Sequence, residues 1–311
     1  MAGLRKKDID SIQRCILSWY RTSHRRFLWR STRDPHIILV SEVMLQQTQV
    51  SRVQEILPRF LKKFPTVRSL ARASKADVIR AWSGMGYNNR AVRLRELARI
   101  VMEKYNGALP SGAVQLRELP GIGRYTASAI ECFSRGKNVP VVDINVRRVL
   151  SRIFWHMGNS SDLKDQRDVL LLASRILPRD AYRWNQALME LGGTICTAQK
   201  PRCDGCPVVD HCFSRGVVRR KNNRPADQEK ITEPMYRGIP RRIWRGRIVE
   251  VLRNETDSRP LTLLQVGRRI KNKFDSRELP WISEIVRALE RDGIVQMTGN
   301  AGRATVALAN E

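Results

Sequence analysis

Four of the six cysteines lie within the 17-residue segment "CTAQKPRCDGCPVVDHC", with the spacing C-x6-C-x2-C-x5-C. They are Cys196, Cys203, Cys206 and Cys212. In a chain without an export signal, thiols crowded in this way indicate metal binding rather than disulfides. Four thiolates suit zinc or a [4Fe–4S] cluster equally well, and the spacing does not distinguish the two. The chain is therefore expected to fold around a metal centre near residue 200.

The net charge predicts a polyanionic partner. The 311 residues include 57 basic and 30 acidic side chains, which gives a formal net charge of +27. Residues 226–311 contribute only 16 basic and 12 acidic side chains, whereas residues 1–225 carry 41 and 18. A field of this sign favours salt-dependent binding to nucleic acid, and it is concentrated in the first two-thirds of the chain.

Apolar residues recur at helical spacing up to about residue 215. Segments such as "IDSIQRCILSWY", "AVRLRELARIVMEKY" and "VRRVLSRIF" follow a 3.6-residue period, which predicts an all-α body of about ten helices. No apolar run approaches ~18 residues, so no membrane contact is expected. The first residues, "MAGLRKKDIDSIQRC", lack an apolar export core, which favours a cytoplasmic, nucleoid-associated monomer.

The character of the sequence changes after the cysteines. Residues 216–240 are polar, punctuated by proline and without periodicity, and they are interpreted as a linker. Residues 241–311 then predict three helices followed by two strands, "IVQMT" and "RATVALA". Three helices and a two-stranded wing resemble a winged-helix module. Some modules of this fold bind DNA, and others mediate contacts with proteins.

The segment "LPGIGRYTASAI" enters a helix through two glycines. Gly121 and Gly123 allow a tight turn, and Arg124 is the first side chain of the new helix. Unpaired N–H groups at a helix start attract anions, although an ordinary helical turn has the same pattern. With the preceding "SGAVQLREL", the segment forms a predicted helix–hairpin–helix at residues 113–129, which suits a DNA phosphate.

An aspartate follows the apolar residues "PVV" and begins another helical period. Asp143 is expected to be the N-cap of that helix, a role that aspartate commonly fills. A capping carboxylate is held rigidly, so the same residue could also act in catalysis beside bound DNA.

Together these motifs resemble the endonuclease III superfamily of DNA glycosylases. Segments "LVSEVMLQQTQVSRV", "LPGIGRYTASAI", "VDINVRRVLSRI" and "NQALMELGGTICTAQKPRCDGCP" are similar to MutY-type adenine DNA glycosylases, and the likeness spans about residues 10–215. The resemblance implies the all-α helix–hairpin–helix glycosylase fold with a [4Fe–4S] cluster. A six-helix barrel would occupy residues 24–129. The cluster domain would combine residues 1–23 with 130–215, and a small winged-helix-like α+β module would follow at 241–311.

The implied reaction is hydrolysis of the N-glycosidic bond of a mispaired adenine that has been flipped out of double-stranded DNA. Glu42 matches the family's general acid, and burial in "IILVSEVML" should raise its pKa and keep it protonated. Asp143 matches the carboxylate that stabilises the cationic sugar, and Asn145 and Tyr125 match residues that hold these groups. Tyr125 also stands where bifunctional relatives place a lysine. Because a phenol cannot form an imine, the enzyme should be monofunctional.

The resemblance also implies a DNA-reading surface. Gln46 and Gln47 match the segment that meets the base opposite the target, and Tyr87 resembles an intercalating aromatic residue. Asn88 and Asn89 depart from the usual MutY-type pattern, and no Nudix-like C-terminal domain is recognisable. Two alternatives therefore stay open. One is a thymine or uracil glycosylase acting on pairs with guanine, and the other is a non-catalytic DNA-binding iron–sulfur protein.

Overall fold

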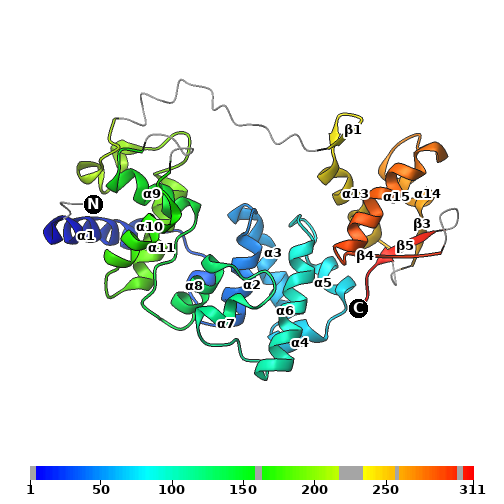
Figure 1. Ribbon diagram of the computed structural model, residues 1–311, viewed down its shortest axis with the longest axis horizontal. Coiled ribbons are helices and arrows are strands. Elements are labelled where there is room, and N and C mark those ends of the chain that lie inside the picture. The colour runs from blue at the N-terminus through cyan, green and yellow to red at the C-terminus, as the bar shows by residue number, and fades with distance from the viewer. Residues whose placement is uncertain (1–4, 158–162, 217–233, 256–258, 300–303) are drawn as a thin grey trace. The chain divides into compact units, whose positions relative to one another are not determined.

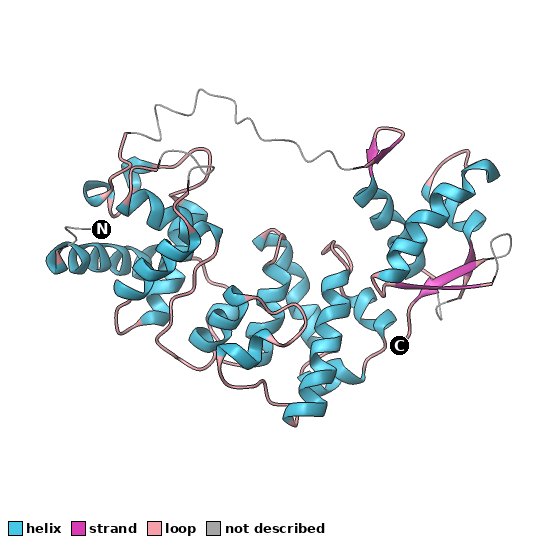
Figure 2. Cartoon of the chain, viewed as in Figure 1, coloured by secondary structure: helices cyan, strands magenta, loops and turns pink. Residues whose placement is uncertain are grey.

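The computed structural model describes residues 5–157, 163–216, 234–255, 259–299 and 304–311. Within these ranges the chain is helical as far as residue 216, and strands occur only in its C-terminal part (Figures 1 and 2). The predicted all-α body with a C-terminal α+β module is therefore confirmed. The helices of the body are α1 (Lys6–Ser23), α2 (Pro35–Leu45), α3 (Val50–Lys63), α4 (Val67–Arg72), α5 (Lys75–Ala81), α6 (Asn89–Tyr105), α7 (Ala113–Arg117), α8 (Arg124–Phe133), α9 (Ile144–Phe154), α10 (Gln166–Arg175) and α11 (Ala181–Thr194).

Single 3-10 turns and a C-terminal set of elements complete the described chain. The turns are η1 (Leu28–Arg30), η3 (Cys203–Gly205), η4 (Val209–His211) and η6 (Ser276–Glu278). The C-terminal elements are β1 (Met235–Tyr236), β2 (Ile239–Pro240), α13 (Arg241–Arg253), β3 (Leu261–Thr262), α14 (Leu263–Ile270), α15 (Leu279–Arg291), β4 (Val295–Thr298) and β5 (Thr305–Leu308). No helix among the described residues has both the length and the apolar character needed to cross a bilayer.

The chain divides into two compact units. Unit 1 comprises Met1–Ile38, Ser111–Arg117 and Ile122–Gln228, and unit 2 comprises Leu39–Pro110, Glu118–Gly121 and Glu229–Glu311. Each unit contains segments that are far apart in the sequence. The domain boundaries expected from the sequence stay a prediction.

Unit 1 is built around the apolar faces of α1, α9, α10 and α11. Ile16 of α1, Val149 of α9, Leu172 of α10 and Leu191 of α11 are all at most 1% exposed and share one core. Val208, within the cysteine segment, is buried in the same core, so the segment that carries the thiols is anchored to these helices.

Unit 2 contains α3, α4, α5 and α6 together with the C-terminal module. Phe60 of α3 packs edge-on against the ring of Trp82, with ring centroids 5.7 Å apart, and both side chains are fully buried. Helix α6 packs against α4 and α5, and α3 packs against α5. These four helices therefore enclose a continuous core.

The C-terminal module has the three predicted helices, α13, α14 and α15, and the two predicted strands, β4 and β5. The structure adds β3, which pairs antiparallel with β5 and gives the sheet order β3-β5-β4. Sequence periodicity did not reveal β3 because two residues are too few to show alternation. The predicted linker, residues 216–240, lies mostly outside the described residues at 217–233, and its last residues form the short β1–β2 pair.

Candidate functional site

Asp143 is the N-cap of α9, as the sequence predicts. Its Oδ1 accepts a hydrogen bond of 2.6 Å from the backbone N–H of Val146, and its Oδ2 accepts one of 2.9 Å from Nδ2 of Asn145. Both carboxylate oxygens are therefore fixed by donors from the first turn of the helix. The side chain is only partly buried, so its charge stays accessible to a ligand.

Asn145 connects this carboxylate to the interior of unit 1. Its Oδ1 accepts a hydrogen bond of 3.0 Å from Nη2 of Arg148, which also donates to the carbonyl of Gly192 at 2.8 Å. A Cβ on Gly192 would lie only 2.9 Å from the Cβ of Asn145, so this close packing of α9 on α11 requires glycine. Arg148 is 5% exposed, and its Nε donates to the carbonyl of Cys196 at 2.9 Å.

The four predicted ligand cysteines line one pocket of unit 1, beside apolar side chains that include Val149 and Ile153. Burial raises the pKa of the Cys206 thiol to about 12 and also raises the pKa of Cys212. Among the described residues, no three His, Cys, Asp or Glu side chains converge on a position for one metal ion. Four cysteines around one pocket are the ligand set that a [4Fe–4S] cluster requires.

Arg152 holds the segment that begins at the first of these cysteines. Its guanidinium is 2% exposed and donates to Sγ of Cys196 at 3.5 Å and to the carbonyl of Thr197 at 2.7 Å. A further hydrogen bond of 2.9 Å reaches the carbonyl of Ala198. Arg148 and Arg152, one turn apart on α9, thus fix the backbone that positions the cluster ligand.

The glycine turn before α8 has a backbone conformation that depends on glycine. Gly121 adopts φ +81°, a conformation that favours glycine, and Gly123 is the N-cap of α8 without a side-chain cap. The first N–H groups of α8 therefore have no side-chain acceptor on the cap residue to which they could donate. Arg124 is exposed at the start of the helix, and Tyr125, the next residue, is half-buried.

Glu42, Gln46 and Gln47 belong to unit 2, in and just after α2. Glu42 is 4% exposed, so it is buried as predicted. Gln46 follows the end of the helix, and Gln47 is exposed with φ +55°. Arg90 holds this end of α2, because its Nη1 donates to the carbonyls of Val43 and Met44 at 3.0 Å each and to that of Gln46.

Arg90 also holds the turn that carries Tyr87. Its Nη2 donates to the carbonyl of Met85 at 3.1 Å and to Oγ1 of Thr48 at 2.9 Å. Tyr87 adopts φ +43° and is 54% exposed, so its ring extends from a constrained turn. Burial lowers the pKa of Arg90 to about 10, although the guanidinium stays charged near neutral pH. The two segments predicted to read DNA, at Gln46 and Tyr87, are thus joined through one arginine.

A buried carboxylate in unit 1 was not identified from the sequence. Glu190 of α11 is fully buried and accepts 2.6 and 2.7 Å hydrogen bonds from Nε of Arg25 and Nη1 of Arg30. Burial by itself would raise the pKa of Glu190, but the hydrogen bonds and charges of the two arginines outweigh it and hold the pKa below its usual range.

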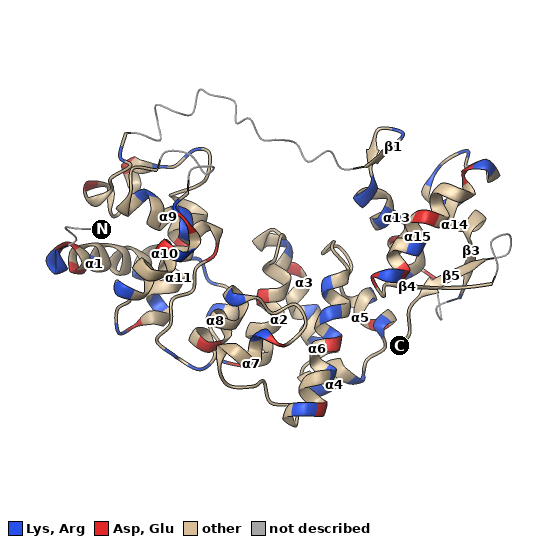
Figure 3. Cartoon of the chain, in the orientation of Figure 1, with Lys and Arg blue, Asp and Glu red and all other residues tan. Residues whose placement is uncertain are grey.

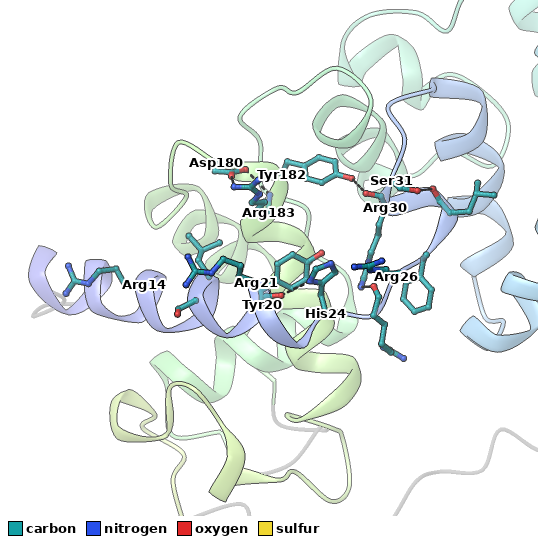
Figure 4. Close-up of a pocket in the computed structure, with 15 residues that line it drawn as sticks. Arg14, Tyr20, Arg21, His24, Arg26, Arg30, Ser31, Asp180, Tyr182 and Arg183 are labelled. Carbon is teal, nitrogen blue, oxygen red and sulfur yellow. Dashed lines mark hydrogen bonds and ion pairs between the residues drawn. The ribbon is translucent and has the colours of Figure 1, made fainter.

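The two arginines bound to Glu190 also line a basic cavity of about 1220 Å³ between α1, η1 and α11 (Figure 4). Among the residues that the structure describes, Asp180 is the single carboxylate in its lining. Blue ribbon segments, which mark Lys and Arg, are also frequent on the other helices in Figure 3, but the arginines described here line one cavity. The arginines that line it are Arg14, Arg21, Arg25, Arg26, Arg30 and Arg183.

Arg90, Arg148, Arg152 and Glu190 were all missed by sequence analysis, although one signal was available. Arg148, Arg152 and Glu190 stand in helices among apolar residues, as in "RRVLSRIF" and "NQALMELGG", whereas Arg90 follows two asparagines and lacks this signal. A charged residue on the core face of a helix is buried only when it is paired, so such residues mark polar networks.

Comparisons with known proteins show which family the chain is related to. Residues 40–178 match the family model described as HhH-GPD superfamily base excision DNA repair protein, and residues 196–212 match the iron–sulfur binding domain of endonuclease III. The cysteine segment is thus the site of a [4Fe–4S] cluster. The structure of a thermostable thymine-DNA glycosylase superposes with a TM-score of 0.63 and 32% identity, over 67% of this chain and 97% of that one.

Two curated relatives are more similar in sequence. The adenine DNA glycosylase of Mycobacterium tuberculosis is 43% identical over 244 residues, which is 76% of this chain and 77% of the relative. The adenine DNA glycosylase of Mycolicibacterium smegmatis is 38% identical over 310 residues, 94% of each protein, so the likeness extends into the C-terminal module. This chain therefore belongs to the adenine DNA glycosylase family, within the HhH-GPD superfamily of base excision DNA repair proteins.

Proposed function

We propose that this protein is a monofunctional adenine DNA glycosylase that removes adenine paired with guanine or 8-oxoguanine in duplex DNA. The observation that carries the proposal is the carboxylate of Asp143, which is held on both oxygens at the start of α9 and is still accessible. The two relatives described above, at 43% and 38% identity, support adenine as the base.

The two proposed catalytic carboxyl groups have different surroundings, and N-glycoside hydrolysis needs such a difference. Glu42 is buried, and as the general acid it would protonate the departing adenine at N7. Asp143 accepts two hydrogen bonds that fix its carboxylate in place, so it would stabilise the positive charge that develops on the sugar. Water then attacks the sugar, and the products are free adenine and an abasic site.

The second residue of α8 limits the reaction to base removal. Tyr125 would contact the sugar or its carboxylates, but a phenol cannot form the imine that strand cleavage requires. The abasic strand should therefore stay intact until another enzyme cuts it.

The DNA contacts proposed here combine backbone and base-reading groups. The start of α8, with Gly121, Gly123 and Arg124, would hold a phosphate. Gln46 and Gln47 would meet the base opposite the target, and Tyr87 would intercalate into the duplex. The arginine-lined cavity would accept the adjoining strand. The protein would act as a monomer, which gel filtration with and without duplex DNA would test.

A second candidate is removal of thymine or uracil opposite guanine, which the 32% identity to a thymine-DNA glycosylase favours. One labelled panel distinguishes the two: duplexes with A·8-oxoguanine, A·G, T·G and U·G pairs, incubated with excess enzyme and treated with alkali to reveal abasic sites. Cleavage of only the adenine duplexes is expected. Cleavage restricted to T·G and U·G would refute the adenine proposal and support the alternative.

A further inference from the structure

The C-terminal module is packed against the helix that precedes the Tyr87 turn. Ala76 and Ile79 of α5 are fully buried in the same apolar core as Ile248 and Leu252 of α13. The backbone N–H of Lys75, at the start of α5, donates a hydrogen bond of 3.2 Å to the carbonyl of Asn310. Within unit 2 the module and α5 therefore form one packed structure (Figure 1).

Arg253, the last residue of α13, extends this contact to the turn itself. Its side chain is 8% exposed, and its Nε donates to the carbonyl of Ile79 at 3.0 Å. Nη2 donates to Oδ1 of Asn88 at 2.6 Å, across 165 positions of sequence, while Nη1 donates to Oε2 of Glu250 at 2.8 Å. A planar guanidinium with three partners in fixed directions holds its neighbours rigidly.

Asn88 is the residue between Tyr87 and α6. It is 9% exposed and is the N-cap of α6, but its side chain makes no capping bond; Oδ1 instead accepts the hydrogen bond from Arg253. Tyr87 itself is exposed and has a positive φ, so its position depends on the groups that hold the turn on each side. On the preceding side Nε1 of Trp82 donates to the carbonyl of Gly86 at 3.1 Å, and on the following side Arg253 holds Asn88.

We propose that Arg253 is a positioning residue through which the C-terminal module sets the opposite-base preference of the enzyme. The module would act by fixing Asn88 and hence the direction of the Tyr87 ring, without touching the base. This inference rests on the proposed role of Tyr87 in the duplex. It gives Asn88, a departure from the usual MutY-type pattern, a specific function as the acceptor for Arg253.

The test compares four single variants of the full chain and the double variant that combines Arg253→Gln with Asn88→Ala. Arg253→Gln and Asn88→Ala each remove the hydrogen bond from one side, and Asn88→Asp keeps an acceptor for Arg253. Arg245→Gln is the matched control, because Arg245 lies on the same helix but pairs with Asp292 inside the module. Thermal unfolding of every variant checks that it is folded. Asn88→Ala changes no residue of the module itself.

Two measurements report on the turn. The first is the ratio of single-turnover rates on A·8-oxoguanine and A·G duplexes, and the second is the fluorescence of a 2-aminopurine placed beside the opposite base. Arg253→Gln and Asn88→Ala should each lower the rate ratio about tenfold, as expected for the loss of a charged hydrogen bond, and both should change the 2-aminopurine signal. In the double variant the rate ratio should fall no further than in either single variant. Asn88→Asp and Arg245→Gln should have wild-type rate ratios and fluorescence.

Wild-type ratios and fluorescence in both Arg253→Gln and Asn88→Ala would overturn the inference. So would an equal loss in Arg245→Gln, because the effect would then come from the module in general. If the wild-type protein proves to act on T·G pairs instead, the proposed function is refuted but the inference about Arg253 is not. The 2-aminopurine signal on a T·G duplex then still decides the inference.

Discussion

Nη2 of Arg148 donates a hydrogen bond of 3.0 Å to Oδ1 of Asn145. An asparagine amide can turn either its oxygen or its nitrogen toward a neighbour, whereas arginine has only donors. Arg148 therefore fixes the amide with its oxygen inward, and the NH2 group points at Oδ2 of Asp143, 2.9 Å away. Because Nε of the same arginine donates to the carbonyl of Cys196, the Asp143 carboxylate, which we propose to be catalytic, is connected to the cluster segment through one side chain.

Replacing Arg148 with methionine should slow base excision while leaving DNA binding nearly unchanged. Asn145 would be free to turn, and the loss of such an orienting partner typically costs about 10- to 100-fold in rate. Single-turnover excision and DNA affinity, measured on the same preparation with its iron content, provide the check. Arg147→Met is the matched control, since Arg147 binds the carbonyls of Leu163 and Lys164 instead. A wild-type rate in Arg148→Met would contradict the connection.

Asp143→Asn separates the helix-capping role of this residue from its proposed role as a negative charge beside the sugar. Asparagine caps helices as well as aspartate does, so α9 should keep its stability, but the negative charge at the sugar is lost. Excision should fall by about a thousandfold, in line with the removal of one electrostatic stabiliser of a transition state. Binding to the duplex should not weaken, because repulsion between the carboxylate and DNA is removed.

Rate and melting temperature of Asp143→Asn should be compared with those of Asp165→Asn. Asp165 caps α10 in the same manner, through a bond from the N–H of Arg167, so it tests the effect of the substitution on a helix start alone. An equal loss of activity in both variants would mean that capping, not charge, explains the effect of Asp143.

Local sequence patterns predicted those parts of the structure that local forces determine. The helices follow from apolar periodicity, and the N-cap of α9 follows from an aspartate placed before an amphipathic segment. Local patterns do not identify the partners of a buried charge, because Arg25 and Arg30, which pair with Glu190, lie 165 and 160 positions away in the sequence. The bond from Arg253 to Asn88 joins residues 165 positions apart, and no local preference encodes it.

Tyr125→Lys should introduce a new chemistry at an existing site. The residue is second in α8 and half-buried, so a neutral lysine amine there would have access to the sugar carbon from which the base leaves. The variant should form an imine with DNA that borohydride reduces to a stable protein–DNA adduct. Denaturing gels detect the adduct, and Arg124→Lys, one residue away, is the control. Absence of an adduct in a folded Tyr125→Lys variant that still binds DNA would exclude Tyr125 from contact with the sugar.

Glu190→Gln should destabilise unit 1 in a manner that depends on pH. The substitution leaves Arg30, 10% exposed, without its counter-charge, and breaking a buried pair typically costs about 3–5 kcal/mol in free energy of unfolding. The pKa of Glu190 is lower in the folded protein than in the unfolded chain. Its ionised form therefore stabilises the fold fully above the unfolded pKa of about 4.3, and this contribution is lost as the pH falls through the folded value.

The difference in unfolding free energy between wild type and Glu190→Gln should consequently be largest at neutral pH and shrink in acid. Urea unfolding at about pH 7, 5 and 3.5, across the range in which a glutamate titrates, measures it directly. Asp168→Asn is the control for an exposed pair with Lys164, and it should change stability by less than about 1 kcal/mol at every pH. A Glu190→Gln effect that stayed constant down to the lowest pH would show that the loss comes from packing rather than from charge.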